Sequence, residues 1–302
     1  MKQRLVLDTE CYRDYWLLMF KSIDGGTVRS YELYDGVSLN VGEIRTILER
    51  YTVVSFNGIN YDMPMITYAL AGASCEMLKQ ASDAIIIGEL RPWEFEKQFK
   101  VKLARNWDHI DLIEVAFGQG SLKLYGGRLH SRKLQDLPIE PDASISPAQR
   151  MDLRTYCLND LDTTIDLYNH LRPQIALREH MTEQYGQDLR SKSDAQIAEA
   201  IIRNQCGVIL GDVVQRPNIP PGTSFKYVAP TWLTYETAEL KAVLRDVVES
   251  TFVVSPTGSV DMPKSLDGRS VAIGHSIYRM GIGGLHSSEQ VQAVVSDEHH
   301  VL

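Results

Sequence analysis

The chain has 302 residues, of which 44% are hydrophobic and 23% charged, proportions that are ordinary for a globular protein. Its formal net charge of −8 argues against a general electrostatic grip on duplex nucleic acid, so a nucleic-acid substrate would have to be held locally. No apolar segment is long enough to span a membrane, and the first residues run directly into a strand, which argues against a signal peptide. Four scattered cysteines without a CxxC pair indicate free thiols and a cytoplasmic protein: Cys11, Cys75, Cys157 and Cys206.

The N-terminal part of the sequence alternates between strand and helix patterns. Helix 41–50 has Ile44, Ile47 and Leu48 at helical spacing, and the predicted strands are short apolar or β-branched runs. This order of strands followed by alternating helices and strands predicts an α/β fold. The expected strands are 4–10, 15–20, 28–34, 52–57 and 108–113, the expected helices are 41–50 and 62–70, and 71–105 is mixed helix and loop.

A strong signal for the start of a further helix lies at residue 146. Ser146 is a predicted N-cap, Pro147 takes the first helical position and Gln149 completes a capping box. The periodic pattern continues to Leu171, and Pro173 is expected to stop this helix.

The rest of the sequence carries few chemical signals. Residues 281–284 (Gly-Ile-Gly-Gly) are predicted to form a structural turn rather than a phosphate cradle, because no helix follows them. The chain ends on apolar residues at 301–302, where a strand begins, and this predicts a longer parent chain. The other expected elements are helices 193–204 and 237–250, strands 252–254 and 271–280, and a proline-rich loop at 216–222 that marks a candidate boundary.

Two carboxylates follow the first predicted strand. Asp8 and Glu10 are two residues apart, so strand geometry projects both to the same face. Like charges about 4 Å apart repel by roughly 4 kcal/mol at an effective dielectric constant near 20, so the pair needs a cation or a proton. The alternative is that both carboxylates are solvated in the turn that follows the strand.

Two further acidic features lie later in the sequence. Asp62 comes directly after the β-branched strand 52–57, and its alternative role is to cap the next helix. Tyr156 and Asp160 are one helical turn apart and share a face, which could equally be a core stripe with an exposed Asp. Hydrolysis of a phosphodiester by two divalent cations needs such a set of carboxylates, and a tyrosine hydroxyl could orient or deprotonate the attacking water.

The three features resemble the exonuclease motifs of the DEDD 3′–5′ exonucleases in order and approximate spacing. The matching segments are Leu7-Asp8-Thr9-Glu10, Asn57-x-x-x-Tyr61-Asp62 and Tyr156-x-x-x-Asp160. A tyrosine four residues before the last Asp resembles the tyrosine subtype, since the histidine subtype would have His where this chain has Thr155. Asn57 and Tyr61 are most similar to the proofreading domain of family B DNA polymerases, those of phages in particular.

The resemblance implies a ribonuclease-H-like mixed sheet flanked by helices. It implies that Asp8, Glu10, Asp62 and Asp160 bind two Mg²⁺ or Mn²⁺ ions and that Tyr156 orients the nucleophilic water. The basic cluster at 121–137 could hold a phosphate backbone or could be a solvated face. The substrate contacts that the resemblance implies are Thr9, Cys11, Phe56, Asn57, Tyr61 and Lys123.

The resemblance divides the chain into an exonuclease domain at 1–185 and a smaller α+β extension at 186–302. The extension is similar, at 193–197 and 278–287, to the segment that joins exonuclease to palm in such polymerases. No polymerase catalytic motif is present, so this chain alone is not expected to polymerise DNA.

The expected activity is hydrolysis of terminal phosphodiesters at a single-stranded DNA 3′ end, with release of nucleoside monophosphates. The polymerase portion of a longer chain is a candidate partner, and the location would be the host-cell cytoplasm if a phage encodes the protein. Two alternatives stay open: a standalone 3′–5′ exoribonuclease with the same site, and a non-catalytic nucleic-acid-binding or assembly module.

Overall fold

The computed structural model describes residues 2–118, 120–215, 217–274 and 276–287. The chain divides into two compact units, Met1–Val213 and Val214–Leu302, and each is described by itself. The strand that is predicted to begin at 301–302 lies outside the described residues.

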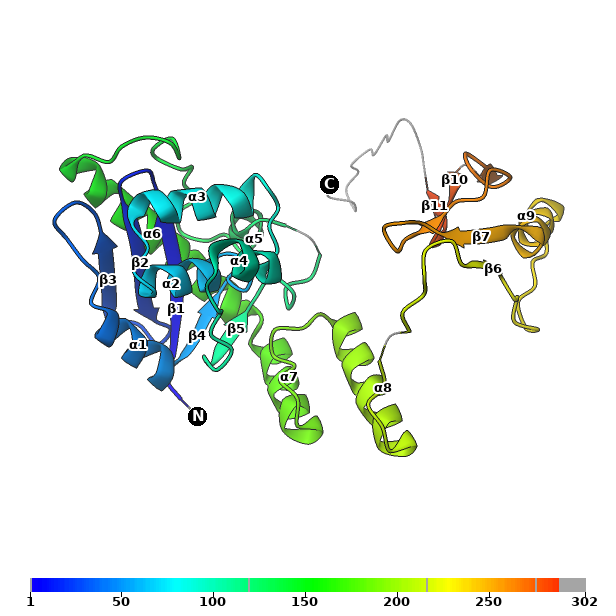
Figure 1. Cartoon of the computed structure of the whole chain (residues 1–302), viewed down its shortest axis with the longest axis horizontal. Helices are drawn as coiled ribbons and strands as arrows, with labels where there is room; N and C mark the ends of the chain where they lie inside the picture. Colours follow the sequence, from blue (N-terminus) through cyan, green and yellow to red (C-terminus); the bar gives the residue numbers. More distant parts are fainter. Residues whose placement is uncertain (1, 119, 216, 275, 288–302) are drawn as a thin grey trace, which may run out of the picture. The chain divides into compact units, whose positions relative to one another are not determined.

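A five-stranded mixed sheet organises the first unit, in the order β3-β2-β1-β4-β5 (Figure 1). β1 pairs antiparallel with β2 and β2 antiparallel with β3, whereas β1, β4 and β5 run parallel. The carboxyl ends of β1, β4 and β5 therefore meet at one edge of the sheet, where open α/β sheets bind their ligands. The strands are β1 (Arg4–Cys11), β2 (Trp16–Ser22), β3 (Val28–Leu33), β4 (Thr52–Ser55) and β5 (His109–Asp111).

Helices cover both faces of this sheet. Strand alternation sends Leu5 and Leu7 of β1 into one apolar cluster, which holds α1 to α4, and Val6 into a second cluster, which holds α5 to α7. The prediction of an α/β fold is therefore confirmed. The helices of this unit are α1 (Val41–Arg50), α2 (Asp62–Leu70), α3 (Cys75–Ile86), α4 (Pro92–Phe99), α5 (Leu122–Arg128), α6 (Pro147–His170), α7 (Arg172–Tyr185) and α8 (Asp194–Leu210).

The prediction that Pro173 stops a helix is only partly right. The capping box at Ser146 and Gln149 begins α6 as expected, and α6 ends at His170. Pro173 then lies in the first turn of α7, where its missing N–H has no helical partner to lose. The sequence pattern did not predict α7 as a separate helix.

The boundary between the units lies later than the predicted boundary at 185/186. Residues that follow α7 turn back onto the first unit: an Arg190 Nη atom lies 2.6 Å from an Asp108 carboxylate oxygen, and Ser191 Oγ accepts a 2.8 Å hydrogen bond from the Asp111 N–H. Arg178 and Asp194 form a further 2.6 Å ion pair across this return. These polar contacts keep the start of α8 in the first unit.

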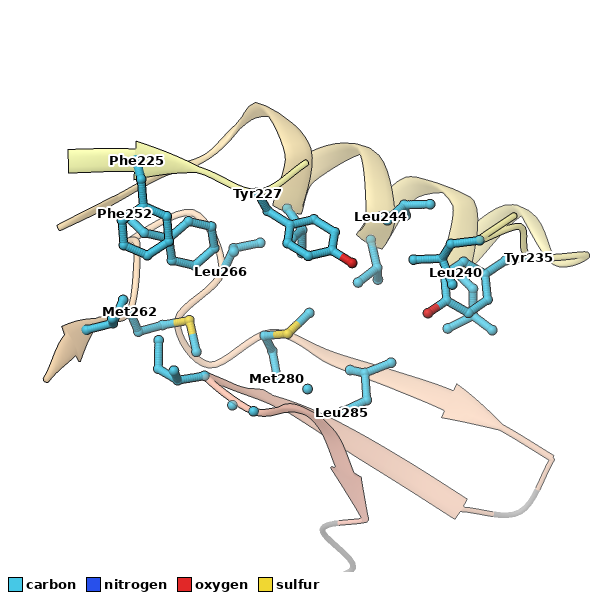
Figure 2. Close-up of a pocket in the computed structure, with 18 residues that line it drawn as sticks. Phe225, Tyr227, Tyr235, Leu240, Leu244, Phe252, Met262, Leu266, Met280 and Leu285 are labelled. Atoms are coloured by element: carbon cyan, nitrogen blue, oxygen red, sulfur yellow. The ribbon is translucent and has the colours of Figure 1, made fainter. Parts of the chain in front are cut away.

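The second unit contains two three-stranded sheets, β6-β7-β8 and β9-β10-β11, and α9. Side chains of α9 face the β10–β11 hairpin across an apolar cavity of about 360 Å³, as Leu244 and Met280 show in Figure 2. The expected strand 271–280 is instead two strands, and residues 281–284 turn between β10 and β11 as predicted. The elements are β6 (Ser224–Lys226), α9 (Ala238–Glu249), β7 (Thr251–Val254), β8 (Val260–Asp261), β9 (Ser270–Ile273), β10 (Ser276–Gly281) and β11 (Gly284–Ser287).

In the described part of the chain, no helix is both long enough and apolar enough to cross a bilayer.

Candidate functional site

Asp8 and Glu10 lie together near the carboxyl end of β1 and face α6. One oxygen of each carboxylate and the Cys157 sulfur all lie within 4.8 Å of one another, a grouping that could hold a metal ion. Cys157 Sγ lies 3.6 Å from Asp8 Oδ2 and donates to it. The two carboxylates lie on one face of β1, as strand alternation predicts, whereas Cys157, which follows Tyr156 inside the third motif, was not predicted to be part of the site.

Asp62 reaches the same edge of the sheet from the opposite face. It is the first residue of α2, after the loop that leaves β4, and only 3% of its surface is exposed. The Thr9 hydroxyl, on the other face of β1 from Asp8, donates a 2.6 Å hydrogen bond to Asp62 Oδ1. The N-cap of α2 is Tyr61, so the alternative of Asp62 as a simple N-cap does not hold.

Tyr156 and Asp160 come from successive turns of α6, as their spacing predicts. Hydrogen bonding from the Tyr156 hydroxyl lowers the pKa of the Asp160 carboxyl group, although burial has the larger effect and raises it. The Asp160 charge in turn raises the pKa values of Asp8 and Glu10. The three acidic motifs thus lie within electrostatic range of one another, although the grouping of ligand atoms within 4.8 Å contains neither Asp62 nor Asp160. Asp160 is half-buried, so the alternative of an exposed Asp160 beside a core stripe does not hold.

Burial raises the pKa of all four carboxyl groups in this cluster, and repulsion from neighbouring carboxylates adds to it for Asp8, Glu10 and Asp62. Burial is the main cause for Asp8 and Glu10, and the neighbouring carboxylates add to it. Burial raises the pKa of Asp62 to about 7, with a contribution from Asp111. Without a cation, the cluster therefore holds protons close to neutral pH.

The donor set fits hard divalent cations. Within the described parts of the chain, Lys123 is the only side-chain cation among the main influences on the four carboxyl pKa values, and it acts on Asp160 alone. Four buried or half-buried carboxyl groups with so little compensating charge are the oxygen-rich environment that Mg²⁺ and Mn²⁺ prefer. The buried thiol of Cys157 adds a softer ligand atom on one side.

Comparison with protein-family models, curated proteins and solved structures finds no match. The interpretation of the site therefore depends on its own geometry.

Three predicted substrate contacts lie in or beside the loop between β4 and α2. Phe56 is half-buried and packs edge-on against Tyr125, with ring centroids 5.8 Å apart. Asn57 has a left-handed backbone with φ of 63°, and its side chain accepts a 2.8 Å hydrogen bond from Asn60. The Tyr61 hydroxyl bonds to Ser82 Oγ at 2.8 Å. Each side chain thus already has a structural partner.

Of the three remaining predicted contacts, Thr9 is bonded to Asp62, and the other two differ in their relation to the site. Cys11 packs among the α1–α4 cluster on the opposite face of β1 from Asp8 and Glu10, and burial raises its pKa to about 12. Lys123 is paired with Asp136 at 3.1 Å, yet its charge lowers the pKa of Asp160. Of these two, only Lys123 acts electrostatically on the acidic cluster.

Asp111 is a site residue that the sequence analysis did not identify. Its fully buried carboxylate accepts 2.8 Å hydrogen bonds from the backbone N–H groups of Asn57 and Ile59 and a 3.1 Å bond from that of Ile113. The carboxylate therefore fixes the loop that delivers Asp62. A signal was present, because Asp111 lies within the predicted strand 108–113. In the structure it ends β5, which pairs parallel with the strand before Asp62.

Gly58 is required where this loop leaves β4. A Cβ at this position would lie 2.0 Å from Ser55 Oγ, 2.7 Å from Ser55 Cβ and 3.3 Å from Asp62 Oδ2. Gly58→Ala is therefore expected to displace the loop and Asp62. In the nuclease activity that the sequence analysis predicts, it should lower kcat/KM by about a hundredfold, the effect of a misplacement of about 1 Å. The measurement is hydrolysis of a labelled single-stranded oligonucleotide.

Two variants serve as controls for Gly58→Ala. Ser55→Gly removes both of the closest contacts, so the double variant should recover part of the lost activity. Gly42→Ala places a methyl group on an exposed position of α1, with its nearest neighbour 3.9 Å away, and should be neutral. Wild-type activity in Gly58→Ala would contradict the proposed constraint.

Proposed function

We propose that the first unit is a metal-dependent 3′–5′ exonuclease with a ribonuclease-H-like fold that acts on single-stranded DNA. The observation that supports this most directly is the convergence of Asp8, Glu10, Asp62 and Asp160, from three remote segments, at the carboxyl edge of the sheet. The resemblance of the three motifs to DEDD exonucleases supports the same activity.

The four carboxylates would hold two Mg²⁺ or Mn²⁺ ions. When bound, such ions polarise a terminal phosphodiester, lower the pKa of an attacking water and stabilise charge on the leaving oxygen. The protein itself contributes a buried cluster of carboxylates. The Thr9 hydroxyl holds Asp62 by a hydrogen bond, and Asp111 holds the loop between β4 and α2 through the Asn57 N–H.

Tyr156 would orient the attacking water rather than deprotonate it. Burial and the nearby charges of Asp160 and Glu10 raise the pKa of its hydroxyl far above neutral pH. The hydroxyl therefore stays protonated, donates to Asp160 and keeps its lone pairs available to a water molecule. A neutral hydroxyl in this place can position a nucleophile but cannot take its proton.

Tyr156→Phe is expected to reduce kcat by about a hundredfold, within the range for a positioned proton-transfer or orienting group, with little change in KM. Loss of the hydroxyl also removes the hydrogen bond that lowers the pKa of Asp160, so the alkaline rise of the pH–rate profile should move to higher pH. The measurement is steady-state hydrolysis between pH 6 and 9. An unchanged kcat would exclude this role.

The biological role that we propose is proofreading beside a phage-type family B polymerase in the cytoplasm. Residues 186–302, which include α8 and the second unit, would correspond to the segment that joins exonuclease and palm, and the polymerase portion of a longer chain would be the partner. Free thiols such as those of the four cysteines are typical of that compartment.

Hydrolysis of end-labelled oligonucleotides tests this function. With Mg²⁺, a 3′ label should appear at once as mononucleotide and a 5′ label should give a descending ladder, and excess EDTA should stop both. A DNA and an RNA oligonucleotide of one sequence decide the substrate preference. A 5′ label released first, or equal rates with EDTA, would contradict the proposal.

A further inference from the structure

A groove beside Asp62 carries two tryptophans and an arginine that the acidic site does not use. It has a volume of about 390 Å³, and its walls include Ile59 and Met63, on either side of Asp62 in the sequence. It is also lined by Trp93 of α4 and by Arg105 and Trp107 from the segment that leads into β5. The groove is therefore continuous with the first turn of the helix that begins at Asp62.

Trp93 is presented to solvent from a fixed position. Its side chain is 61% exposed, although its neighbour Phe95 is completely buried against Phe99, with ring centroids 4.7 Å apart. The Arg91 N–H donates a 3.0 Å hydrogen bond to Glu94, which closes the first turn of α4. A large aromatic ring held in water by a rigid helix is suited to stacking against a flat partner.

The same segment is basic in an acidic protein. Residues 91–105 contain five arginines or lysines and two glutamates, within a chain of formal net charge −8. Glu96 fixes the segment by accepting a 2.8 Å hydrogen bond from the Leu103 N–H, and it lies 3.6 Å from Arg105, whose side chain is 80% exposed. The five basic residues are all exposed: Arg91, Lys97, Lys100, Lys102 and Arg105.

We propose that this groove binds the single-stranded DNA that leads to the cleaved terminus. Bases would stack on Trp93 and Trp107, and Arg105 with the neighbouring lysines would contact phosphates. Single-stranded nucleic-acid sites combine these two elements, aromatic platforms and a positively charged path. The inference rests on the proposed exonuclease function and adds a second substrate-binding region outside the acidic cluster.

Binding of a fluorescent twelve-nucleotide oligothymidylate in EDTA tests the groove without cleavage. Trp93→Ala is expected to weaken binding about tenfold, as loss of one stacked base would. Arg105→Glu should weaken binding and reduce the dependence of log Kd on log salt by about 0.7 for each lost phosphate contact. Trp232→Ala, which removes a 77% exposed tryptophan of the second unit, is the matched control and should bind normally.

Cleavage kinetics separate the groove from the acidic site. With Mg²⁺, Trp93→Ala should reduce the preference in kcat/KM for the twelve-nucleotide substrate over a trinucleotide by about tenfold. Wild-type affinity in both Trp93→Ala and Arg105→Glu would overturn the groove inference, whatever the activity. An inactive wild-type protein that binds the oligonucleotide through Trp93 would overturn the exonuclease proposal and retain the groove.

Discussion

Asp8→Asn is expected to abolish the proposed nuclease activity and, in the metal-free protein, to raise the melting temperature at alkaline pH. Activity should fall on the order of a thousandfold or more, because metal-assisted stabilisation of the transition state contributes several kcal/mol. Stability should rise because Asn removes a buried charge that burial, Asp62 and Asp160 all disfavour. Functional sites often carry such a conflict between stability and activity.

The sign of the pH dependence follows from the raised pKa of Asp8. In the unfolded chain this carboxyl group titrates near 3.8, and in the folded protein its pKa lies well above that value. The folded state therefore holds the proton more tightly, so metal-free stability is full at low pH and declines as pH rises from about 4 through the folded pKa. Melting in EDTA at pH 5.5 and pH 8 should show this decline in wild type and a smaller one in Asp8→Asn.

Mn²⁺ should reverse the alkaline loss of stability more fully in wild type than in Asp8→Asn. Addition of the ion at pH 8 should raise the melting temperature of wild type more than that of Asp8→Asn, because binding to the folded state stabilises it. Asp24→Asn, at an exposed position, is the matched control for loss of one carboxylate. A fully active Asp8→Asn, or one that melts below wild type in EDTA at pH 8, would contradict the assignment.

Asp111→Ala is expected to cost the first unit roughly 3–9 kcal/mol of stability. It leaves three backbone N–H groups without their acceptor, at about 1–3 kcal/mol for each buried unsatisfied donor. The loop that carries Asp62 should lose its fixed position, so activity should fall even in the fraction that stays folded. Urea unfolding and oligonucleotide hydrolysis measure the two effects.

Asp111→Asn provides a graded control. Oδ1 accepts from the N–H groups of Asn57 and Ile113, and Oδ2 accepts from that of Ile59. An amide retains one acceptor oxygen but turns its NH₂ group toward the remaining N–H, so the loss of stability should lie between wild type and Asp111→Ala. A loss for Asp111→Ala below about 1 kcal/mol, less than one unsatisfied buried donor costs, would show that water replaces the carboxylate.

The acidic residues could be predicted from sequence because each has a local signal. Asp8 and Glu10 follow the two-residue period of a strand, and Tyr156 and Asp160 follow the turn of a capped helix. The parallel arrangement that brings Asp62 to the same edge was implied by the order of strands and helices. Local periodicity therefore recovered most of the candidate site.

The parts that were missed depend on contacts between distant segments. Asp111 acts on residues 57–59, which are remote in sequence, and its role appears only when β4 and β5 pair. The groove combines α2 with residues 93–107, and the sequence pattern gave that region only as mixed helix and loop. Propensity and spacing do not carry information about which surfaces of separate elements face each other.

The central position of β1 also limits how this chain can vary in length. β1 is paired on both sides, by β2 and by β4, so it cannot shift along one neighbour without breaking its register with the other. Insertion of a single residue after Leu7 would move each following side chain to the other face of β1. Asp8 and Glu10 would then point toward α2, and Thr9 would point toward α6. Homologous chains that keep this chemistry should therefore differ by insertions in surface loops, with the spacing from Leu7 to Glu10 invariant.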